Sequence, residues 1–314
     1  MKLAWPLCAT KVHPSRCIPS STSFDFQFSD GFIQKHRKRL KRWESGLIKA
    51  QQQRRYEFCK SYPNTIWYLS KLQKLFSRSG QTVVPIGSSV NGLKTQDSDL
   101  DLVLITHQDD ARRAEFTKKF ANVQSFRKAQ MDRVARILND PKLVQAGSVQ
   151  QLVFCNVPIV KFRGRDGTSV DLQFNNIGSI RSTLFVRTCV EWSVAVPIVI
   201  HWMNSFFDSV KLKNSRNGLF SSYHLNMLVL HFLQSSALSF CPDVFTRYPQ
   251  LDPSFSWHGV VRLLTAEIAD APYIHADAVQ DISAAETIVK MIDYYSQLDL
   301  QNIAVSIDGK ICKR

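Results

Sequence analysis

Two aspartates separated by one residue stand at the start of an apolar run, where they could bind a metal ion. Asp99 and Asp101 flank Leu100 and lead into Leu102–Leu104. Because side chains alternate faces along a β-strand, both carboxylates would point to one face and the leucines to the other. Carboxylate oxygens at such a position suit Mg²⁺ or Mn²⁺. Asp-x-Asp also occurs often by chance on solvent-facing strand edges.

A third carboxylate and a glycine turn make the pattern more specific. Asp171 lies in Val170–Phe174, which alternates in the same way, and Gly87-Ser88 follows another apolar run. Three acids around two cations roughly 3.5 to 4 Å apart suit in-line phosphoryl displacement, which needs an activated hydroxyl and a stabilised pyrophosphate leaving group. Glycine lets the backbone approach a triphosphate closely, and the Ser88 hydroxyl could bind it.

The elements that must position these residues are predicted from hydrophobic periodicity. Short β-branched or aromatic runs predict strands over 82–86, 100–105, 151–155, 157–162 and 169–174. A helical segment over 110–138 separates the second strand from the third. Before the strands, a polar stretch through Cys59 has helical character, and a second helix is predicted over 64–79 with Asn64, after Pro63, as its N-cap.

From about residue 182 to the end of the chain, the periodicity is helical. Helices are predicted over 194–207, 222–234, 257–264 and 284–297, with polar loops between them. The sequence therefore predicts an α+β protein in which a mixed sheet with flanking helices is joined to an all-α domain.

Composition favours a folded protein with a polyanionic partner. The chain of 314 residues is 44% hydrophobic and 11% aromatic and has a formal net charge of +14. The densest basic run, 35–42, could bind phosphates, act as a nuclear signal or form a solvated helix face. The seven cysteines lack zinc-ligand spacing, which predicts free thiols in a reducing compartment.

The compartment is predicted from the lack of a membrane-spanning apolar run and from the composition of the N-terminal residues. No apolar run approaches the roughly 18 to 20 residues that span a bilayer, so no membrane association is expected. Residues 1–24 contain basic residues and no acid, as in a mitochondrial presequence, but an irregular N-terminus is the favoured interpretation. We expect a cytoplasmic protein, with the nucleus as the alternative and the mitochondrion less favoured.

The combined motif resembles the DNA polymerase β-like nucleotidyltransferase superfamily. Its signature of Gly-Ser followed by Asp-x-Asp is matched by Gly87-Ser88 and by Asp99 to Asp101, with Asp171 as the third acid. The longer stretches Gly87–Leu93 and Ser98–Leu102 look like the non-canonical poly(A) polymerases and terminal uridylyltransferases within it. The resemblance covers about residues 64 to 309.

This resemblance implies a domain organisation and further nucleotide-binding residues. It implies an irregular tail over 1–30, a catalytic domain over 64–183, and a helical central domain made of 31–63 and 184–314. Asn176 and Thr183 would contact the ribose and the triphosphate; Ser222 would bind phosphate and Tyr223 would stack on the base. Gly87 and Ser88 would complete the nucleotide site.

Two departures from the family bear on activity. The positions where relatives usually carry two triphosphate-binding lysines hold Asn204 and Asp208, and Asp208 would repel a triphosphate. Lys211, Lys213 and Arg216 in the next loop could substitute for them. The chain also ends at Arg314, before the segment that shapes the base pocket in relatives, so no base-selecting residue is predicted.

The predicted function is template-independent transfer of AMP from ATP to an RNA 3′ end, using Mg²⁺ or Mn²⁺. A uridylyltransferase using UTP, a catalytically inactive scaffold that binds RNA or protein, and a transferase acting on a small molecule or a protein are the alternatives. The sequence contains no recognisable RNA-binding module, so RNA choice would depend on a partner protein or on surface charge.

Overall fold

The computed structural model describes residues 24–96, 98–235, 237–238, 240–241, 244, 248–252, 254–266, 282–305 and 311–313. The chain divides into two compact units. We call residues 54–184 and 256–273 the sheet unit, and residues 1–53, 185–255 and 274–314 the helical unit. Most of the predicted tail and the stretch resembling a presequence lie outside the described residues.

The first element is one helix where the sequence predicts two. Helix α1 spans Gln27–Ser77 with Pro63 inside it and a local departure from helical geometry at His36. Proline costs an interior helix one hydrogen bond and a steric clash. Here Phe58 and Tyr62 before Pro63, and Tyr68 and Leu72 after it, are all buried. Burial on both sides of Pro63 therefore holds the chain helical, and Asn64 is not an N-cap.

The sheet unit contains a five-stranded mixed sheet. Its strands are β1 (Thr82–Ile86), β2 (Leu100–Ile105), β3 (Gln150–Leu152), β4 (Ile159–Arg163) and β5 (Ser169–Phe174). Their spatial order is β1-β2-β5-β4-β3. Strands β2 and β5 pair in parallel, and the other pairs are antiparallel. The five predicted strands therefore form one sheet.

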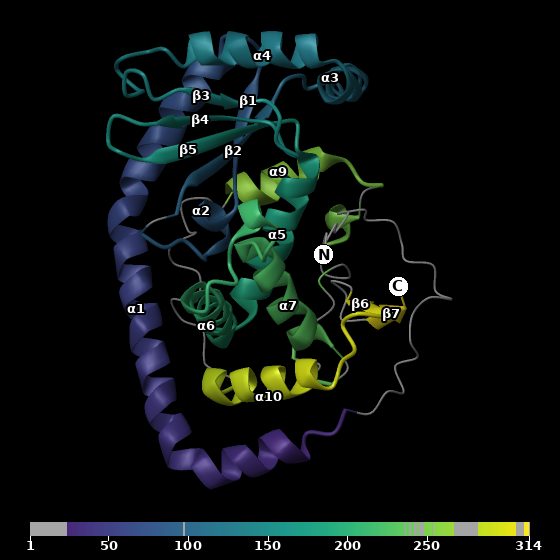
Figure 1. Cartoon of the computed structure of the whole chain (residues 1–314). Coiled ribbons are helices and arrows are strands. Elements are labelled where there is room, and N and C mark those ends of the chain that lie inside the picture. Colours follow the sequence, from purple (N-terminus) through teal and green to yellow (C-terminus); the bar gives the residue numbers. More distant parts are fainter. Residues whose placement is uncertain are drawn as a thin grey trace. The chain divides into compact units, whose positions relative to one another are not determined.

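Alternation along the strands gives this sheet two different faces. One face packs against α1, α3 (Asp110–Asn122) and α4 (Gln124–Ile137), which lie beside it in Figure 1. Its core includes Leu102, Leu172 and Phe162 from three neighbouring strands. Asp101, Asp171 and Lys161, one residue away on the same strands, must point to the opposite face.

Two short elements complete the sheet unit. Helix α2 (Ser88–Asn91) follows β1, and α9 (Trp257–Ala266), far along the chain, belongs to the same unit. The indole Nε1 of Trp257 donates a hydrogen bond of 3.0 Å to Asp110 at the start of α3. The Arg113 guanidinium lies 4.6 Å from the centre of the Trp257 ring. This Trp-Asp-Arg contact fixes α9 to α3.

Helices make up most of the other unit. After α5 (Ile177–Trp192), which crosses the boundary between units, come α6 (Ala195–Ser209), α7 (Ser222–Gln234) and α10 (Ala284–Ser296), with short 3₁₀ turns at Ser215–Asn217 and Pro249–Leu251. Strands β6 (Ile303–Val305) and β7 (Ile311–Lys313) pair as a small antiparallel sheet that the sequence did not predict. The α+β fold class is confirmed.

Two expectations about membranes and thiols can be compared with this structure. No single helix in the described part of the chain is long and apolar enough to cross a membrane. Among the described cysteines, those at positions 59, 155, 189, 241 and 312 form no disulfide with one another. Burial raises the pKa of Cys241 to about 12, so this thiol is unreactive at neutral pH.

Candidate active site

Three charged side chains stand in one row across the sheet. Asp101 on β2 is the register partner of Asp171 on β5, and Asp171 is the register partner of Lys161 on β4. Residues opposite each other on adjacent strands point to the same face and lie about 5 Å apart. Asp99, which precedes β2 by one residue, joins them. The structure thus brings together all three predicted catalytic carboxylates, with a lysine among them.

Lys161 forms salt bridges with two of the three carboxylates. Its ammonium Nζ lies 3.0 Å from Oδ2 of Asp99 and 2.9 Å from Oδ1 of Asp171. Burial opposes the charged form of Lys161, but the hydrogen bonds with Asp171 and Asp99 outweigh it and raise the pKa of this lysine above its usual value. Lys161 therefore stays protonated and supplies the positive charge that the acid cluster needs.

Asp101 is the carboxylate with no direct ammonium partner in this cluster. Burial, followed by repulsion from Asp171 and Asp99, raises the pKa of Asp101 to about 7, and the attraction of Lys161 only partly opposes this. An ionised Asp101 is therefore costly in the absence of a further cation. Raised carboxylate pKa values of this kind are typical of sites built to bind metal or to move protons.

Gly87 lets the backbone pass directly over this cluster. Its backbone has φ 67° and ψ −149°, a conformation that is nearly restricted to glycine. A Cβ atom at this position would lie 2.9 Å from Oδ2 of Asp101, which is closer than real Cβ atoms approach an oxygen. The turn that carries Ser88 can therefore reach the carboxylates only because residue 87 has no side chain.

Thr183 and Asn176 support the site from the chain that follows β5. The Thr183 hydroxyl accepts a hydrogen bond of 3.0 Å from the Gly87 N–H and donates one of 2.7 Å to the Ser179 carbonyl. The Asn176 Oδ1 accepts from the Ser179 N–H, which caps the start of α5. Thr183 is buried, so its hydroxyl serves the Gly87 turn in this structure.

The remaining predicted nucleotide contacts belong to the helical unit. Ser222 is exposed and Tyr223 half-buried at the start of α7, where Ser221 provides the N-cap. The Nδ2 of Asn204 on α6 donates to Oδ1 of Asn226 on α7 at 2.9 Å, and Asp208 is exposed one turn later. No cation therefore replaces the expected lysines at these two positions. In the following loop Lys211 is exposed, Lys213 is half-buried, and the side chain of Arg216 lies outside the description.

Sequence reasoning missed two residues that shape the site. Strand prediction over 157–162 includes Lys161 but gives it no role in the site. A lysine inside the apolar run Ile159–Phe162 indicates that one face of this strand is polar. Asn175 is buried with φ 48°, and its Oδ1 accepts from the backbone N–H of Thr106 while its Nδ2 donates to the Thr106 hydroxyl. Asn175 thus ties the ends of β2 and β5 together and keeps Asp101 and Asp171 in register.

The oxygen atoms of the three carboxylates are chemically suited to bind a divalent cation. Hard carboxylate oxygens gather on one face, and Lys161 supplies a positive charge to two of them. Within the described ranges, no three acidic, imidazole or thiol side chains converge into a complete metal cage. A metal bound by Asp99, Asp101 and Asp171 would therefore require Lys161 to release at least part of its contacts.

Replacing Lys161 with methionine is expected to destabilise the protein in EDTA more than in Mg²⁺. Without the ammonium, three neighbouring carboxylates repel one another, at a cost of about 1 to 2 kcal/mol after solvent screening. A bound divalent cation would offset that repulsion and stabilise the folded state. Thermal melting with EDTA and with Mg²⁺ measures both effects.

Lys119→Met is the matched control, because Lys119 pairs with Glu115 at 2.8 Å on the exposed side of α3. Loss of this surface pair should change the melting temperature little in either buffer. An equal loss for Lys161→Met with and without Mg²⁺ would argue against cation binding by the carboxylates.

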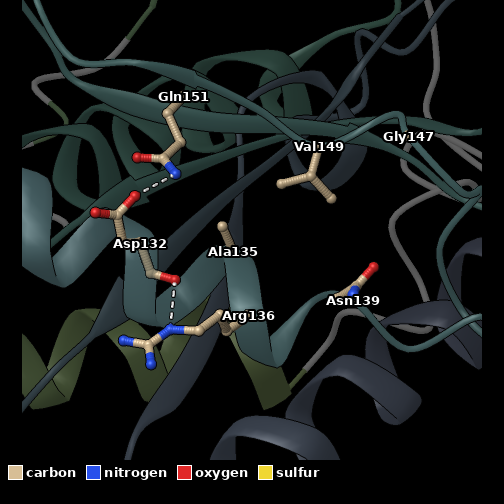
Figure 2. A pocket seen from close by; sticks show the side chains of 7 residues that line it. All are labelled: Asp132, Ala135, Arg136, Asn139, Gly147, Val149 and Gln151. Carbon is tan, nitrogen blue, oxygen red and sulfur yellow. Dashed lines mark hydrogen bonds between the residues drawn. The ribbon is translucent and has the colours of Figure 1, made fainter.

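A pocket in the sheet unit lies away from the three carboxylates and Lys161. It has a volume of about 560 Å³ and is lined by Asp132, Ala135, Arg136, Asn139, Gly147, Val149 and Gln151. Figure 2 shows the Gln151 amide donating to the Asp132 carboxylate, a hydrogen bond of 2.9 Å. Gln151 is the register partner of Val160, which belongs to the core face. This pocket is therefore on the opposite face of the sheet from the carboxylates.

The chain is similar to known nucleotidyltransferases in sequence. Residues 47–191 match the family model described as Poly(A) RNA polymerase, mitochondrial-like, central palm domain. The chain is 29% identical over 262 residues to Poly(A) RNA polymerase GLD2 of Danio rerio, covering 81% of this chain and 49% of that protein. It is 30% identical over 192 residues to the Bos taurus protein, covering 60% and 37%. The chain spans between about a third and a half of the length of such curated relatives.

Solved structures share the fold at lower identity. The structure of a GLD-2/RNP-8 complex matches with a TM-score of 0.68 and 20% identity, covering 86% of this chain and 81% of that one. The Cid1 poly(U) polymerase H336N mutant bound to MgATP matches with a TM-score of 0.61 and 16% identity, covering 87% and 80%. These likenesses show that the fold of this chain is shared with those structures.

Proposed function

Because this chain belongs to the non-canonical poly(A) polymerase family, which is related to the Cid1 uridylyltransferases, we propose that it extends RNA 3′ ends without a template. The transferred group is AMP from ATP, and pyrophosphate is released. The observation that carries the proposal is the row of charges across β2, β5 and β4, with Asp101 and Asp171 as register partners and Asp99 beside them.

The proposed roles follow from the position of each side chain. Asp99 and Asp101 would hold both metal ions, and Asp171 would hold the one on the nucleophile side. Bound there, Mg²⁺ or Mn²⁺ would supply activation of the attacking hydroxyl and stabilisation of the leaving pyrophosphate. Asp171 would also accept the proton of the RNA 3′-hydroxyl. Its side chain is 19% exposed, so water is partly excluded from it.

The proposed nucleotide contacts follow from the resemblance to the family. Gly87 and Ser88 would bind the triphosphate, with Thr183 holding the Gly87 turn through its hydrogen bond. Asn176 would contact the ribose. In the helical unit, we assign Ser222 to a phosphate and Tyr223 to the face of the base, because an aromatic ring stacks on any base.

ATP is favoured over UTP by the wording of the motifs. The stretches Gly87–Leu93 and Gly218–Gln234 look closer to poly(A) polymerases than to uridylyltransferases, and several curated relatives of this chain are named as poly(A) RNA polymerases. Two solved relatives carry protein partners, RNP-8 and GLD-3, by their titles. We therefore propose that an RNA-binding partner protein selects the RNA for this chain in the cytoplasm.

Extension of a labelled oligo(A) RNA tests the function. Incubated with Mg²⁺ or Mn²⁺ and one ribonucleotide at a time, the protein should give a ladder with ATP and less product with UTP, GTP or CTP. The Asp99→Ala/Asp101→Ala double variant should give no ladder with any nucleotide. A ladder with UTP alone would reassign the protein as a uridylyltransferase.

A second candidate function, a scaffold that binds RNA or protein without transfer, is favoured by Asn204 and Asp208. Both occupy positions where cations would neutralise a triphosphate, and the exposed Asp208 adds a negative charge instead. No extension with any nucleotide or metal, combined with no metal-dependent ATP binding, would support the scaffold.

Asp208→Lys is expected to strengthen ATP binding about threefold to thirtyfold, because it replaces a repulsive charge with an attractive one near the triphosphate. Ser209→Lys, a neighbouring exposed position at the end of α6, adds a cation that points elsewhere and should have little effect. The KM for ATP in the extension assay measures both variants. Equal KM values in Asp208→Lys and the parent protein would show that residue 208 lies away from the triphosphate.

A further inference from the structure

The first half of α1 carries an unusual concentration of unpaired positive charge. Every lysine and arginine of the basic run, namely Lys35, Arg37, Lys38, Arg39, Lys41 and Arg42, is exposed. Among the described residues, none of these six makes an ion pair. This surface therefore carries its charge uncompensated.

The acids of the same helix segment are engaged with α10. Asp30 pairs with Lys290 of α10 at 3.1 Å. Glu44 accepts hydrogen bonds from the Ser283 hydroxyl at 2.8 Å and the Ala285 N–H at 2.6 Å, where it caps the start of α10. The face toward α10 thus uses the acidic groups, and the cations are left to solvent.

An aromatic series lies next to the basic run within the helical unit. Trp43 follows Arg42 directly, and its ring centroid lies 6.0 Å from that of Trp202 on α6. Trp202 in turn stacks on Phe206 with centroids 5.3 Å apart and an angle of 8° between the rings. Phe206 is 45% exposed. Arg39 precedes Trp43 by four residues, so the two side chains lie on the same face of α1.

We propose that the basic run of α1, together with Trp43, Trp202 and Phe206, is a binding surface for single-stranded RNA outside the catalytic carboxylates. Phosphates would contact the six cations, and an unpaired base would stack on the exposed ring of Phe206. Grooves that combine backbone-tracking cations with stacking aromatics are how proteins bind single strands without sequence preference.

The charge selects RNA over a protein as the occupant. The six cations lie within about 10 Å along α1, which is length enough for about two phosphates of an extended strand. An apolar protein interface would have to bury or displace all of them. RNA binding at this surface is independent of transfer; that the bound strand is the one extended at its 3′ end rests on the proposed function.

Fluorescence anisotropy with a labelled 20-nucleotide single-stranded RNA tests the surface. EDTA and the absence of nucleotide keep the catalytic carboxylates out of the measurement. The variant Arg37→Gln/Lys38→Gln/Arg39→Gln/Lys41→Gln keeps helix propensity while removing four charges. Its affinity should fall at least about tenfold, and the slope of log K against log salt should fall by up to about 3.

A matched variant removes the same charge elsewhere. Arg112→Gln/Lys118→Gln/Lys128→Gln/Arg133→Gln changes four exposed cations of α3 and α4 in the sheet unit. It should bind RNA within about threefold of the parent protein. An equal loss in both variants would overturn the proposal in favour of a bulk charge effect.

The aromatic part is tested separately. Phe206→Ala should weaken single-stranded RNA binding about fivefold or more, whereas Phe206→Tyr should retain it, because stacking needs only an aromatic face. Double-stranded RNA offers no unpaired base, so its binding should not respond to Phe206→Ala. Parent-like affinity in the quadruple α1 variant would overturn RNA binding here and leave the surface to a protein partner. The Asp99→Ala/Asp101→Ala variant should bind RNA normally, which separates this proposal from the catalytic one.

Discussion

Replacing Asp101 with asparagine is expected to abolish nucleotide transfer and, in the same variant, to make the metal-free protein more stable. Both effects have one origin. Asp101 lies buried beside Asp171 and Asp99, and this environment raises its pKa to about 7. Concentrated negative charge at this position destabilises the folded protein when no cation is bound. The same charge would hold a divalent cation for transfer.

If Asp101 is the proposed metal ligand, transfer should fall at least about thousandfold, because losing such a ligand removes several kcal/mol of transition-state stabilisation. Single-turnover extension of oligo(A) with ATP measures the loss. Glu115→Gln is the control, since this carboxylate lies exposed on α3 and its one ion pair in the described part of the chain is with Lys119. Activity within tenfold of the parent in Asp101→Asn would contradict the assignment of the site.

The stability gain has a definite dependence on pH. The folded-state pKa of about 7 lies above the ordinary value of 3.8, so the folded protein binds this proton more tightly than the unfolded chain. As pH rises from 3.8 toward 7, the unfolded chain loses this proton while the folded protein keeps it, so the free energy of unfolding falls progressively. Above pH 7 the folded protein also loses the proton, and the full cost of the buried charge remains. Asparagine carries no charge and removes the cost.

In EDTA at pH 8, Asp101→Asn should raise the melting temperature by a few degrees, corresponding to about 1 to 3 kcal/mol. The gain should shrink at pH 5. Differential scanning calorimetry at both pH values provides the measurement. A larger gain at pH 5 than at pH 8 would mean that Asp101 is not the charge being relieved.

Gly87→Ala is expected to reduce transfer by more than about a hundredfold while the protein stays folded. The added Cβ would lie 2.9 Å from Oδ2 of Asp101, and the backbone at φ 67° and ψ −149° disfavours any side chain. Either the turn moves away, together with its hydrogen bond to Thr183, or Asp101 rotates out of line. A displacement of 1 Å at reacting groups commonly costs this much.

Gly80→Ala separates geometry from backbone strain. Gly80 also has a positive φ, 70°, but nothing lies within 4 Å of a Cβ added there. This variant should lose about 1 kcal/mol of stability and keep its activity. Steady-state extension kinetics and thermal melting of both glycine variants make the comparison. Comparable activity losses in the two variants would show that strain alone, without the Asp101 contact, explains the effect.

Much of the sheet unit is determined by local pattern. Alternation of apolar and polar residues predicted β2 and β5, and the same alternation predicted that Asp99, Asp101 and Asp171 face away from the leucine core. A glycine at position 87 was predicted to let the backbone approach a triphosphate, which stays a prediction; in the structure Gly87 has a positive φ and passes close to Asp101. Such features depend on residues within a few positions of one another, so a sequence displays them directly.

The tertiary structure decided what depends on distant residues. Strand β5 pairs with both β2 and β4, which are not consecutive in the chain. This pairing brings Asp101 of β2 and Lys161 of β4 to either side of Asp171. Burial of Phe58, Tyr62 and Tyr68 keeps α1 continuous through Pro63, against the local preference for a break. The pKa of Asp101 likewise comes from burial and from two other acids. Strand order, burial and charge clustering are set by contacts between segments far apart in sequence, which periodicity within one segment cannot report.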